Sequence, residues 1–158
     1  MKEKRICRKC NEEKLLELFV YNPLCKKNRE WECKMCRINY VRKRYNSIHG
    51  RAQKLYTDTL NRSLAKGRDH DLTVEWIEDK LRNGVCEETG IKLDLNTFGR
   101  ERRHIYNAPS LDKVNPDGGY TMDNVKMTCL IYNIAKGEYT KEVLYNFCKE
   151  LVKHFEIL

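Results

Sequence analysis

Apolar residues recur at steps of three and four between residues 37 and 64, which is the spacing of one face of an α-helix. Gly50 lies inside this stretch, and we expect it to break the helix into two. The apolar positions that define the pattern are Ile38, Val41, Tyr45, Ile48, Ala52 and Leu55.

Two further helices are indicated by the residues at their ends. Thr73 is a suitable N-cap and Gly84 a stop signal, so the sequence predicts a helix over 74–83. Thr140 is a suitable N-cap for a last helix, whose apolar stripe we interpret as part of the core, with a dimer seam as the alternative. That stripe consists of Val143, Leu144, Phe147, Cys148, Leu151, Val152 and Phe155.

Residues 110–136 combine strand and helix patterns. Residues 110–114 alternate as a strand does, and the Asn-Pro-Asp-Gly-Gly sequence at 115–119 is a dense turn signal. Residues 120–122 are expected to return as a second short strand, and 125–136 to form a helix. The predicted order is strand, loop, strand and helix, within an α+β fold.

The net charge of +8 is unevenly distributed along the chain. Residues 1–69 hold 19 Lys and Arg against 8 Asp and Glu, whereas residues 70–158 hold 12 against 15. Because Lys and Arg release counterions when they contact phosphates, the basic half predicts a double-stranded DNA partner; a solvated surface is the alternative. There is neither a long apolar run nor an apolar leader, so we expect a cytoplasmic protein without a membrane partner.

Eight cysteines in a chain without a leader favour metal binding over disulfides. Cys7 with Cys10, and Cys33 with Cys36, form two C-x2-C pairs. Each such turn brings two thiolates to one ion, and two turns complete a tetrahedral site. This site has no open coordination position, so we predict one structural Zn²⁺ that contributes much of the folding energy of the segment. Cys25 is then expected to be a free thiol.

Basic side chains are concentrated between residues 37 and 68, with nine Lys and Arg and one Asp. We expect them to contact DNA phosphates or to enter a groove, and a solvated helix face is the alternative. A second basic group, at 100–103, is expected either to hold the DNA backbone or to be a solvated loop. The residues predicted to contact DNA are Arg37, Arg42, Lys43, Arg44, Arg51, Lys54, Arg102 and Arg103.

Residues 110–136 contain S-L-D-K-V, then G-Y-T-x-D-N-V, then C-x-x-x-N. This pattern resembles the HNH nucleases, whose ββα-metal unit has two strands and a helix, in the variant found in phage-type and PacI-like enzymes. The N-terminal C-x2-C pairs and the linking helical region are similar in plan as well. The resemblance implies a metal-dependent DNA endonuclease that hydrolyses phosphodiester bonds and leaves 5′-phosphate and 3′-hydroxyl ends.

The resemblance also implies roles for three residues. Asp112 matches the family's metal-binding carboxylate, Asn133 matches its second metal ligand, and Asn124 matches the asparagine that ties the loop to the strands. A hard cation such as Mg²⁺ or Mn²⁺ prefers oxygen ligands and retains waters, which leaves room for phosphate oxygens. Such an ion would stabilise the phosphorane and the leaving 3′ oxygen.

One departure from the family pattern concerns the general base, which is usually a histidine directly after the carboxylate. This chain has Lys113 there, and we expect a cationic clamp on the transition state, since the unperturbed pKa of lysine is about 10.4. His104 is then the candidate base, provided that the chain bends near Pro109. Tyr106, another histidine or a metal-bound hydroxide are the alternatives.

A second departure concerns zinc. PacI-like relatives carry a second structural zinc on two more C-x2-C pairs, of which this chain keeps only the first members, Cys86 and Cys129. Two sulfurs do not make a closed site, so we expect these cysteines to pack as neighbouring small apolar residues.

Together these expectations divide the chain into three parts. They are a four-cysteine zinc module at 1–37, a basic helical DNA-contacting region at 38–84, and an HNH nuclease domain with its last helix at 85–158. The alternative functions are a non-catalytic zinc-containing DNA-binding protein and a phage junction-resolving nuclease. The resemblance places the protein in the cytoplasm of a bacterium or a phage-infected cell, and the dimer seam named above would make it a homodimer.

Overall fold

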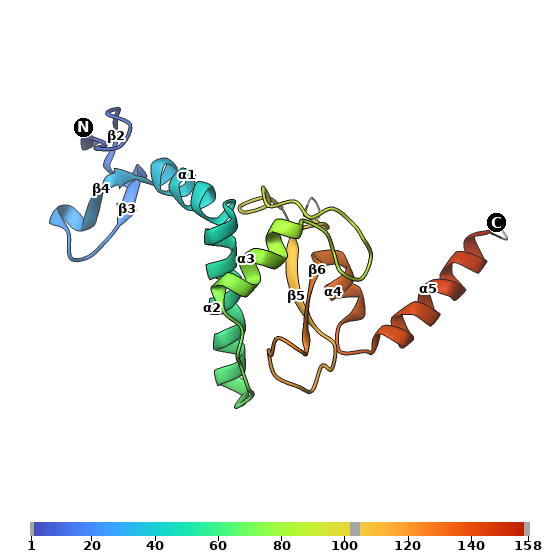
Figure 1. Ribbon diagram of the computed structural model, residues 1–158. Coiled ribbons are helices and arrows are strands. Elements are labelled where there is room, and N and C mark those ends of the chain that lie inside the picture. Colours follow the sequence, from blue (N-terminus) through green and yellow to red (C-terminus); the bar gives the residue numbers. More distant parts are fainter. Residues whose placement is uncertain (1, 102–104, 157–158) are drawn as a thin grey trace. The chain divides into compact units, whose positions relative to one another are not determined.

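The computed structural model describes residues 2–101 and 105–156 (Figure 1). The chain divides into two compact units between Arg44 and Tyr45, and each is described by itself. Within the described ranges, no helix combines the length and the apolar character that crossing a membrane requires.

The first unit is built from two short antiparallel hairpins and one helix, of which only the last residue lies beyond the unit. Strand β1 (Lys4–Ile6) pairs with β2 (Glu13–Leu15), and β3 (Phe19–Tyr21) pairs with β4 (Arg29–Cys33). Short 3₁₀ turns lie at Leu16–Leu18 and Lys26–Asn28, and α1 covers Lys34–Tyr45. The buried core of this unit is formed by Cys7, Phe19 and Cys33. So small a core supplies little hydrophobic stabilisation.

Helix α2 (Ile48–Lys66) begins three residues after α1 ends, so the long apolar pattern is divided into two helices. The helix is interrupted at residues 46–47, so the predicted break at Gly50 is wrong. The Ser47 side chain caps α2 by accepting a hydrogen bond from the Gly50 backbone N–H at 3.1 Å. Gly50 is therefore a buried residue of the first turn of α2.

The prediction for residues 74–83 is confirmed by α3 (Val74–Asn83). The Thr73 hydroxyl accepts a hydrogen bond from the Trp76 backbone N–H at 3.1 Å. Gly84 ends the helix in the left-handed region, at φ 67°. Both ends are thus set by local chemistry, which is why the sequence was sufficient to place them.

Strand β5 (Pro109–Lys113) pairs with β6 (Val125–Cys129) in an antiparallel hairpin, with Leu111 opposite Met127. Helix α4 follows directly at Leu130–Lys136. The second strand predicted at 120–122 and the helix predicted to start at 125 are therefore wrong. The apolar positions of 125–129 alternate with a period of two, and pairing with β5 is what selects the strand.

The loop at 114–124 packs against another part of the chain instead of returning beside β5. The Tyr120 N–H donates to the Asp69 carbonyl at 2.9 Å, and the Met122 N–H donates to the Asp71 carboxylate at 2.7 Å. These bonds fix the loop on residues 69–71. Both backbone groups of Tyr120 and the Met122 N–H are satisfied there, so they are not available to β5.

Gly119 permits this close approach, because a Cβ at that position would overlap the Asp69 backbone carbonyl. Gly119→Ala is expected to lower the free energy of unfolding by about 1–3 kcal/mol, as overpacking does. Urea unfolding would measure the loss. Gly90→Ala is the comparison, since a Cβ there meets nothing within 4 Å and only the positive φ of 69° is unfavourable. A larger loss for Gly90→Ala than for Gly119→Ala would contradict this account.

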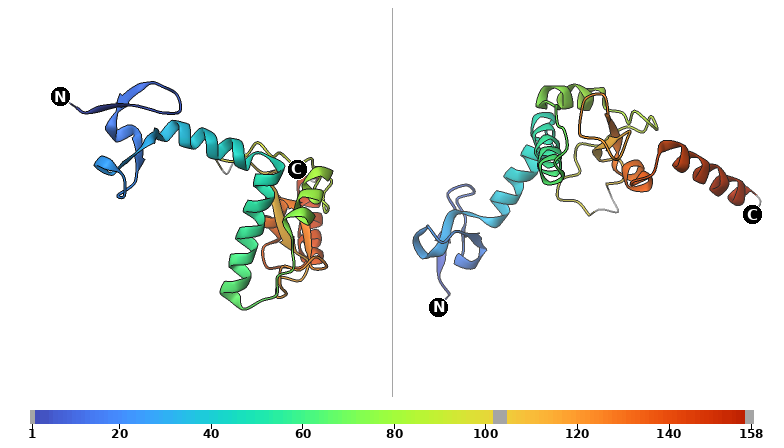
Figure 2. Two further views of the ribbon diagram at one scale, coloured as in Figure 1. Left: turned by 60° about the vertical axis from the view of Figure 1, so that its left-hand side comes forward. Right: turned by 90° about the horizontal axis from the view of Figure 1, so that it is seen from below.

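Both faces of the β5–β6 hairpin are covered, as Figures 1 and 2 show, with α2 and α3 on one side and α4 on the other. Successive strand residues point to opposite faces. Leu111 and Met127 join the main core with Ile77, while Asp112 is buried on the opposite face. The remaining buried members of the core are Ala52, Leu72, Leu81, Cys86, Leu93, Val125 and Cys129.

Cys86 and Cys129 are 1% and 0% exposed and belong to the same core. The prediction that they pack as small apolar residues is confirmed.

The last helix, α5 (Lys141–Glu156), starts directly after Thr140, and the Thr140 hydroxyl accepts from the Val143 N–H at 3.5 Å. Its start is as predicted. The interpretation of its apolar stripe as core is wrong, because no residue of α5 is buried and Phe147 is 62% exposed. A seam between two copies of the chain stays a prediction.

Candidate functional sites

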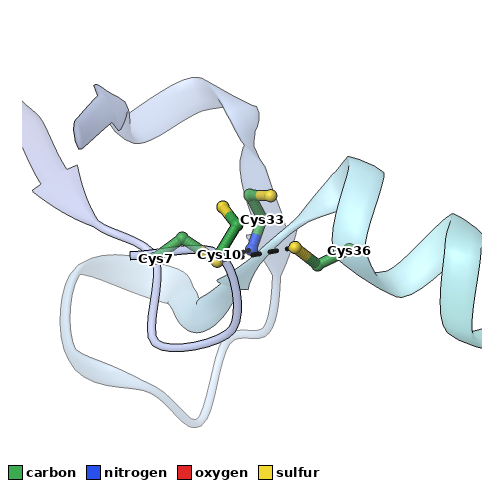
Figure 3. Close-up of side chains that lie close together, drawn as sticks. All are labelled: Cys7, Cys10, Cys33 and Cys36. Carbon is green, nitrogen blue, oxygen red and sulfur yellow. Dashed lines mark hydrogen bonds between the residues drawn. The ribbon is translucent and has the colours of Figure 1, made fainter. Parts of the chain in front are cut away.

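Four cysteine side chains converge in the first unit (Figure 3). Cys7 follows β1, Cys10 lies in the turn to β2, Cys33 ends β4 and Cys36 lies in the first turn of α1. Their Sγ atoms all lie within 4.8 Å of one another. Two segments that are distant in sequence thus bring both C-x2-C pairs to one point.

The spacing of these sulfurs fits a tetrahedral metal site. With a Zn–S bond of about 2.3 Å, the sulfurs of a tetrahedron lie about 3.8 Å apart, and Cys7 and Cys36 are 3.9 Å apart. Burial raises the pKa of the Cys7 thiol, but backbone N–H groups outweigh burial and bring the pKa down to about 6. The geometry of the four sulfurs therefore allows them to bind a metal such as zinc.

The second site lies on the face of the β5–β6 hairpin that α4 covers. Asn133 and Lys136 are one turn apart on α4, and Ser110 and Asp112 are two residues apart on β5, so each pair shares one face. The Asn133 amide nitrogen donates to the Ser110 hydroxyl at 2.7 Å and to the Leu111 carbonyl at 3.0 Å. The Lys136 ammonium donates to the Asp112 carboxylate at 3.1 Å. Helix and strand are thus joined by two parallel sets of polar contacts.

Asp112 and Lys136 form a buried ion pair, with side chains 7% and 2% exposed. The Lys136 ammonium also donates to the Lys113 carbonyl at 2.9 Å. Burial raises the pKa of Asp112, and the Lys136 ammonium opposes that rise only in part. The carboxylate is therefore held in a fixed orientation beside a cation, in surroundings that penalise an isolated charge.

Asn124 holds the 114–124 loop together. Its amide nitrogen donates to the carbonyls of Asn115 at 3.1 Å and Gly119 at 2.9 Å, and its amide oxygen accepts from the Asn115 N–H at 2.8 Å. Lys113, at the end of β5, donates to the carbonyls of Pro116 and Gly118. Burial lowers the pKa of Lys113, as do nearby positive charges. The Asn124 side chain thus holds the loop in one conformation, and the Lys113 side chain ties the loop to the end of the strand.

A pocket of about 370 Å³ opens beside this polar face. Asp112 and Asn133 both line it, so the two residues predicted as metal ligands are brought together. Its other walls come from the C-terminal end of α2, the 114–124 loop and the end of α4. The charged side chains among its lining residues are Arg62, Lys66, Arg68, Asp112, Lys113, Asp117, Lys136 and Glu138.

The residues predicted to contact DNA have several different environments. Arg51 is buried and donates to the Leu95 carbonyl and the Thr97 hydroxyl. Lys54 pairs with Asp58 on the same helix. In the first unit, Arg37 pairs with Glu30 and Glu32. Exposed basic side chains follow in the last turn of α1, at Arg42, Lys43 and Arg44.

Three of the predicted residues, Arg102, Arg103 and His104, lie outside the described residues. No histidine lines the pocket among the residues that the structure describes. Tyr106, one of the alternative bases, is 55% exposed and does not line the pocket.

Sequence reasoning missed Lys136 and the α2 wall of the pocket. Lys136 has a local signal, because it follows Asn133 by three residues and so shares its helix face. Arg62 and Lys66 belong to the basic stretch at 37–68, but no local signal places them at the pocket, because the pocket is formed only when α2 and the hairpin come together.

No protein family and no curated protein matches the sequence. Among solved structures, the rare-cutting HNH restriction endonuclease PacI is similar, with 14% sequence identity and a TM-score of 0.42. The similarity covers 95% of this chain and 94% of that chain.

Proposed function

We propose that this protein is a metal-dependent DNA endonuclease that hydrolyses phosphodiester bonds and leaves 5′-phosphate and 3′-hydroxyl ends. One observation carries the proposal: the Asp112 carboxylate and the Asn133 amide, which belong to different elements, line the same pocket, and its other walls are largely cationic. Oxygen ligands beside positive charge are what a hard cation and a phosphodiester require together.

The side chains of the pocket fit a divalent cation such as Mg²⁺ or Mn²⁺. Because the Asn133 nitrogen is used by Ser110 and Leu111, the amide oxygen is the atom that Asn133 has to offer. The Asp112 carboxylate would supply the charged ligand. When bound, the ion would stabilise negative charge on the phosphate and on the leaving oxygen.

The other residues of the site act by holding these two ligands. The Lys136 ammonium keeps one carboxylate oxygen of Asp112 in place, and Asn124 keeps the loop beside β5 in one conformation. Lys113 donates to loop carbonyls, and we propose that it adds positive charge beside the phosphate. Fixed positioning of this kind is how phosphoryl-transfer sites obtain much of their rate.

We further propose that Cys7, Cys10, Cys33 and Cys36 hold one structural Zn²⁺. All four ligand positions are then filled by thiolates, so that site has no position open for a substrate. Its contribution would be to the folding of the first unit, whose apolar core is small.

Supercoiled plasmid DNA incubated with and without Mg²⁺ or Mn²⁺ tests the nuclease proposal. Cleavage that needs the added metal is expected, and Asn133→Ala is expected to lower its rate by about 10- to 100-fold. Asn107→Ala is the matched control, because the Asn107 amide donates to the Lys92 carbonyl and does not line the pocket. If the protein binds DNA but cleaves it neither with Mg²⁺ nor with Mn²⁺, the proposal is contradicted and a non-catalytic DNA-binding protein is favoured.

A further inference from the structure

The Lys and Arg side chains of the second unit differ in whether an acidic side chain pairs with them. Over 45–101 and 105–156, most Lys and Arg side chains form ion pairs, as Lys80 does with Glu87 and Lys126 with Glu88. Three of the pocket's cations, Arg62, Lys66 and Lys113, form none. In the same ranges the other cations without an ion pair are Arg51, Lys92 and Lys149.

Arg62 and Lys66 lie four residues apart on α2, so both side chains leave the same face of the helix. Both are exposed and both line the pocket that contains Asp112. The Arg62 guanidinium reaches the Tyr120 hydroxyl at 3.4 Å, which is a long contact to a neutral group. Among the described residues, neither cation therefore has an acidic side chain within ion-pair distance.

The other Lys and Arg side chains of α2 are already bound by protein groups. Arg51 is buried against the carbonyl of Leu95, and Lys54 is neutralised by Asp58. The positive charge that α2 presents to an anion thus lies at its C-terminal end. A helix C-terminus carries partial negative charge, which stabilises cations near it. Because this stabilisation involves no acidic side chain, the charged groups remain available to a ligand.

We propose that Arg62 and Lys66 form a phosphate-binding wall, which contacts the backbone of the DNA strand whose scissile phosphate lies between Asp112 and Asn133. This assignment deepens the proposed nuclease function and rests on it. It moves the DNA contact of α2 away from Arg51 and Lys54, where the sequence pattern had placed it. Contacts to phosphates carry no base information, so the wall positions the strand irrespective of its sequence.

The test is the salt dependence of binding to a labelled random-sequence duplex, measured by fluorescence anisotropy with the zinc-loaded full chain and no other divalent metal. Each lost phosphate contact lowers the slope of log K against log[KCl] by about 0.9. Arg62→Ala/Lys66→Ala is therefore expected to lower the slope by about 1.8, and Lys66→Ala alone by half as much. Arg62→Lys/Lys66→Arg is expected to keep the wild-type slope.

Lys92→Ala/Lys149→Ala is the matched control, because it removes two exposed cations without ion pairs that do not line the pocket. Its slope is expected to stay close to that of the wild type. An equal decrease in the control and in the wall variant would overturn the proposal, as would an unchanged slope in the wall variant. This binding needs no catalytic metal, so the two proposals can fail separately. A lower slope in Arg62→Ala/Lys66→Ala, together with no plasmid cleavage by the wild type, would support the wall and reject the nuclease function. Plasmid cleavage by the wild type, together with an unchanged slope in that variant, would support the nuclease function and reject the wall.

Discussion

Asp112→Asn is expected to lower the rate of metal-dependent plasmid cleavage by about 10²- to 10³-fold. The substitution removes the charge of the carboxylate that we propose as a metal ligand beside Asn133. It keeps an oxygen that can accept from Lys136, so the local contacts change little in shape. The initial rate of supercoiled-plasmid cleavage in Mg²⁺ or Mn²⁺, at enzyme concentrations above those of the DNA, measures the effect.

The buried ion pair makes a stability control necessary. Removing one partner of such a pair costs about 3–5 kcal/mol, because the other charge is left buried without compensation. Asp112→Asn and Asp112→Ala would both leave the Lys136 ammonium without its partner charge, so each would lose activity partly by unfolding. Asp112→Asn/Lys136→Met removes both charges, and we expect it to recover stability relative to Asp112→Ala while staying inactive. Cleavage at the wild-type rate by either asparagine variant would show that Asp112 is not a metal ligand.

Cys7→Ser, or removal of zinc by a chelator, is expected to unfold the first unit while the second keeps its own unfolding transition. Structural zinc contributes apparent folding energies of about 10–16 kcal/mol. The apolar core of this unit consists of Cys7, Phe19 and Cys33, so no other interaction of comparable size is present.

Trp31 provides the measurement for this unit. Its ring lies 4.4 Å from the guanidinium of Arg5 and 4.3 Å from that of Arg8, so its emission reports the packing of the hairpins. In a Trp76→Phe background it is the only tryptophan of the chain. Cys25→Ser is the matched control, since Cys25 lies in the same unit outside the four-cysteine cluster. Stoichiometric zinc and unchanged emission in Cys7→Ser would contradict the structural role.

The sequence alone was sufficient where the determining interactions are local. A threonine N-cap and a glycine stop fix α3, and the C-x2-C spacing brings each cysteine pair together within its own turn. The start of the last helix after Thr140 is of the same kind. In each case the atoms that decide the structure are a few residues apart in the chain.

Tertiary structure decided what depends on distant partners. Residues 125–129 become a strand because β5 offers hydrogen bonds to them, while residues 120–122 are held by the backbone at 69–71. The apolar stripe of α5 is exposed. A periodic pattern indicates that one face of a helix is apolar, but it does not indicate which element covers that face.

The pocket illustrates both contributions. Asp112 and Asn133 could be named from a motif, because residue type and spacing survive in the sequence. Their environment could not: Lys136 becomes the partner of Asp112 only when α4 packs on β5. Arg62 and Lys66 face the pocket only when α2 packs beside the hairpin. Charge, burial and pairing are properties of assembled surfaces, so the sequence determined the candidate ligands and the fold determined the field in which they act.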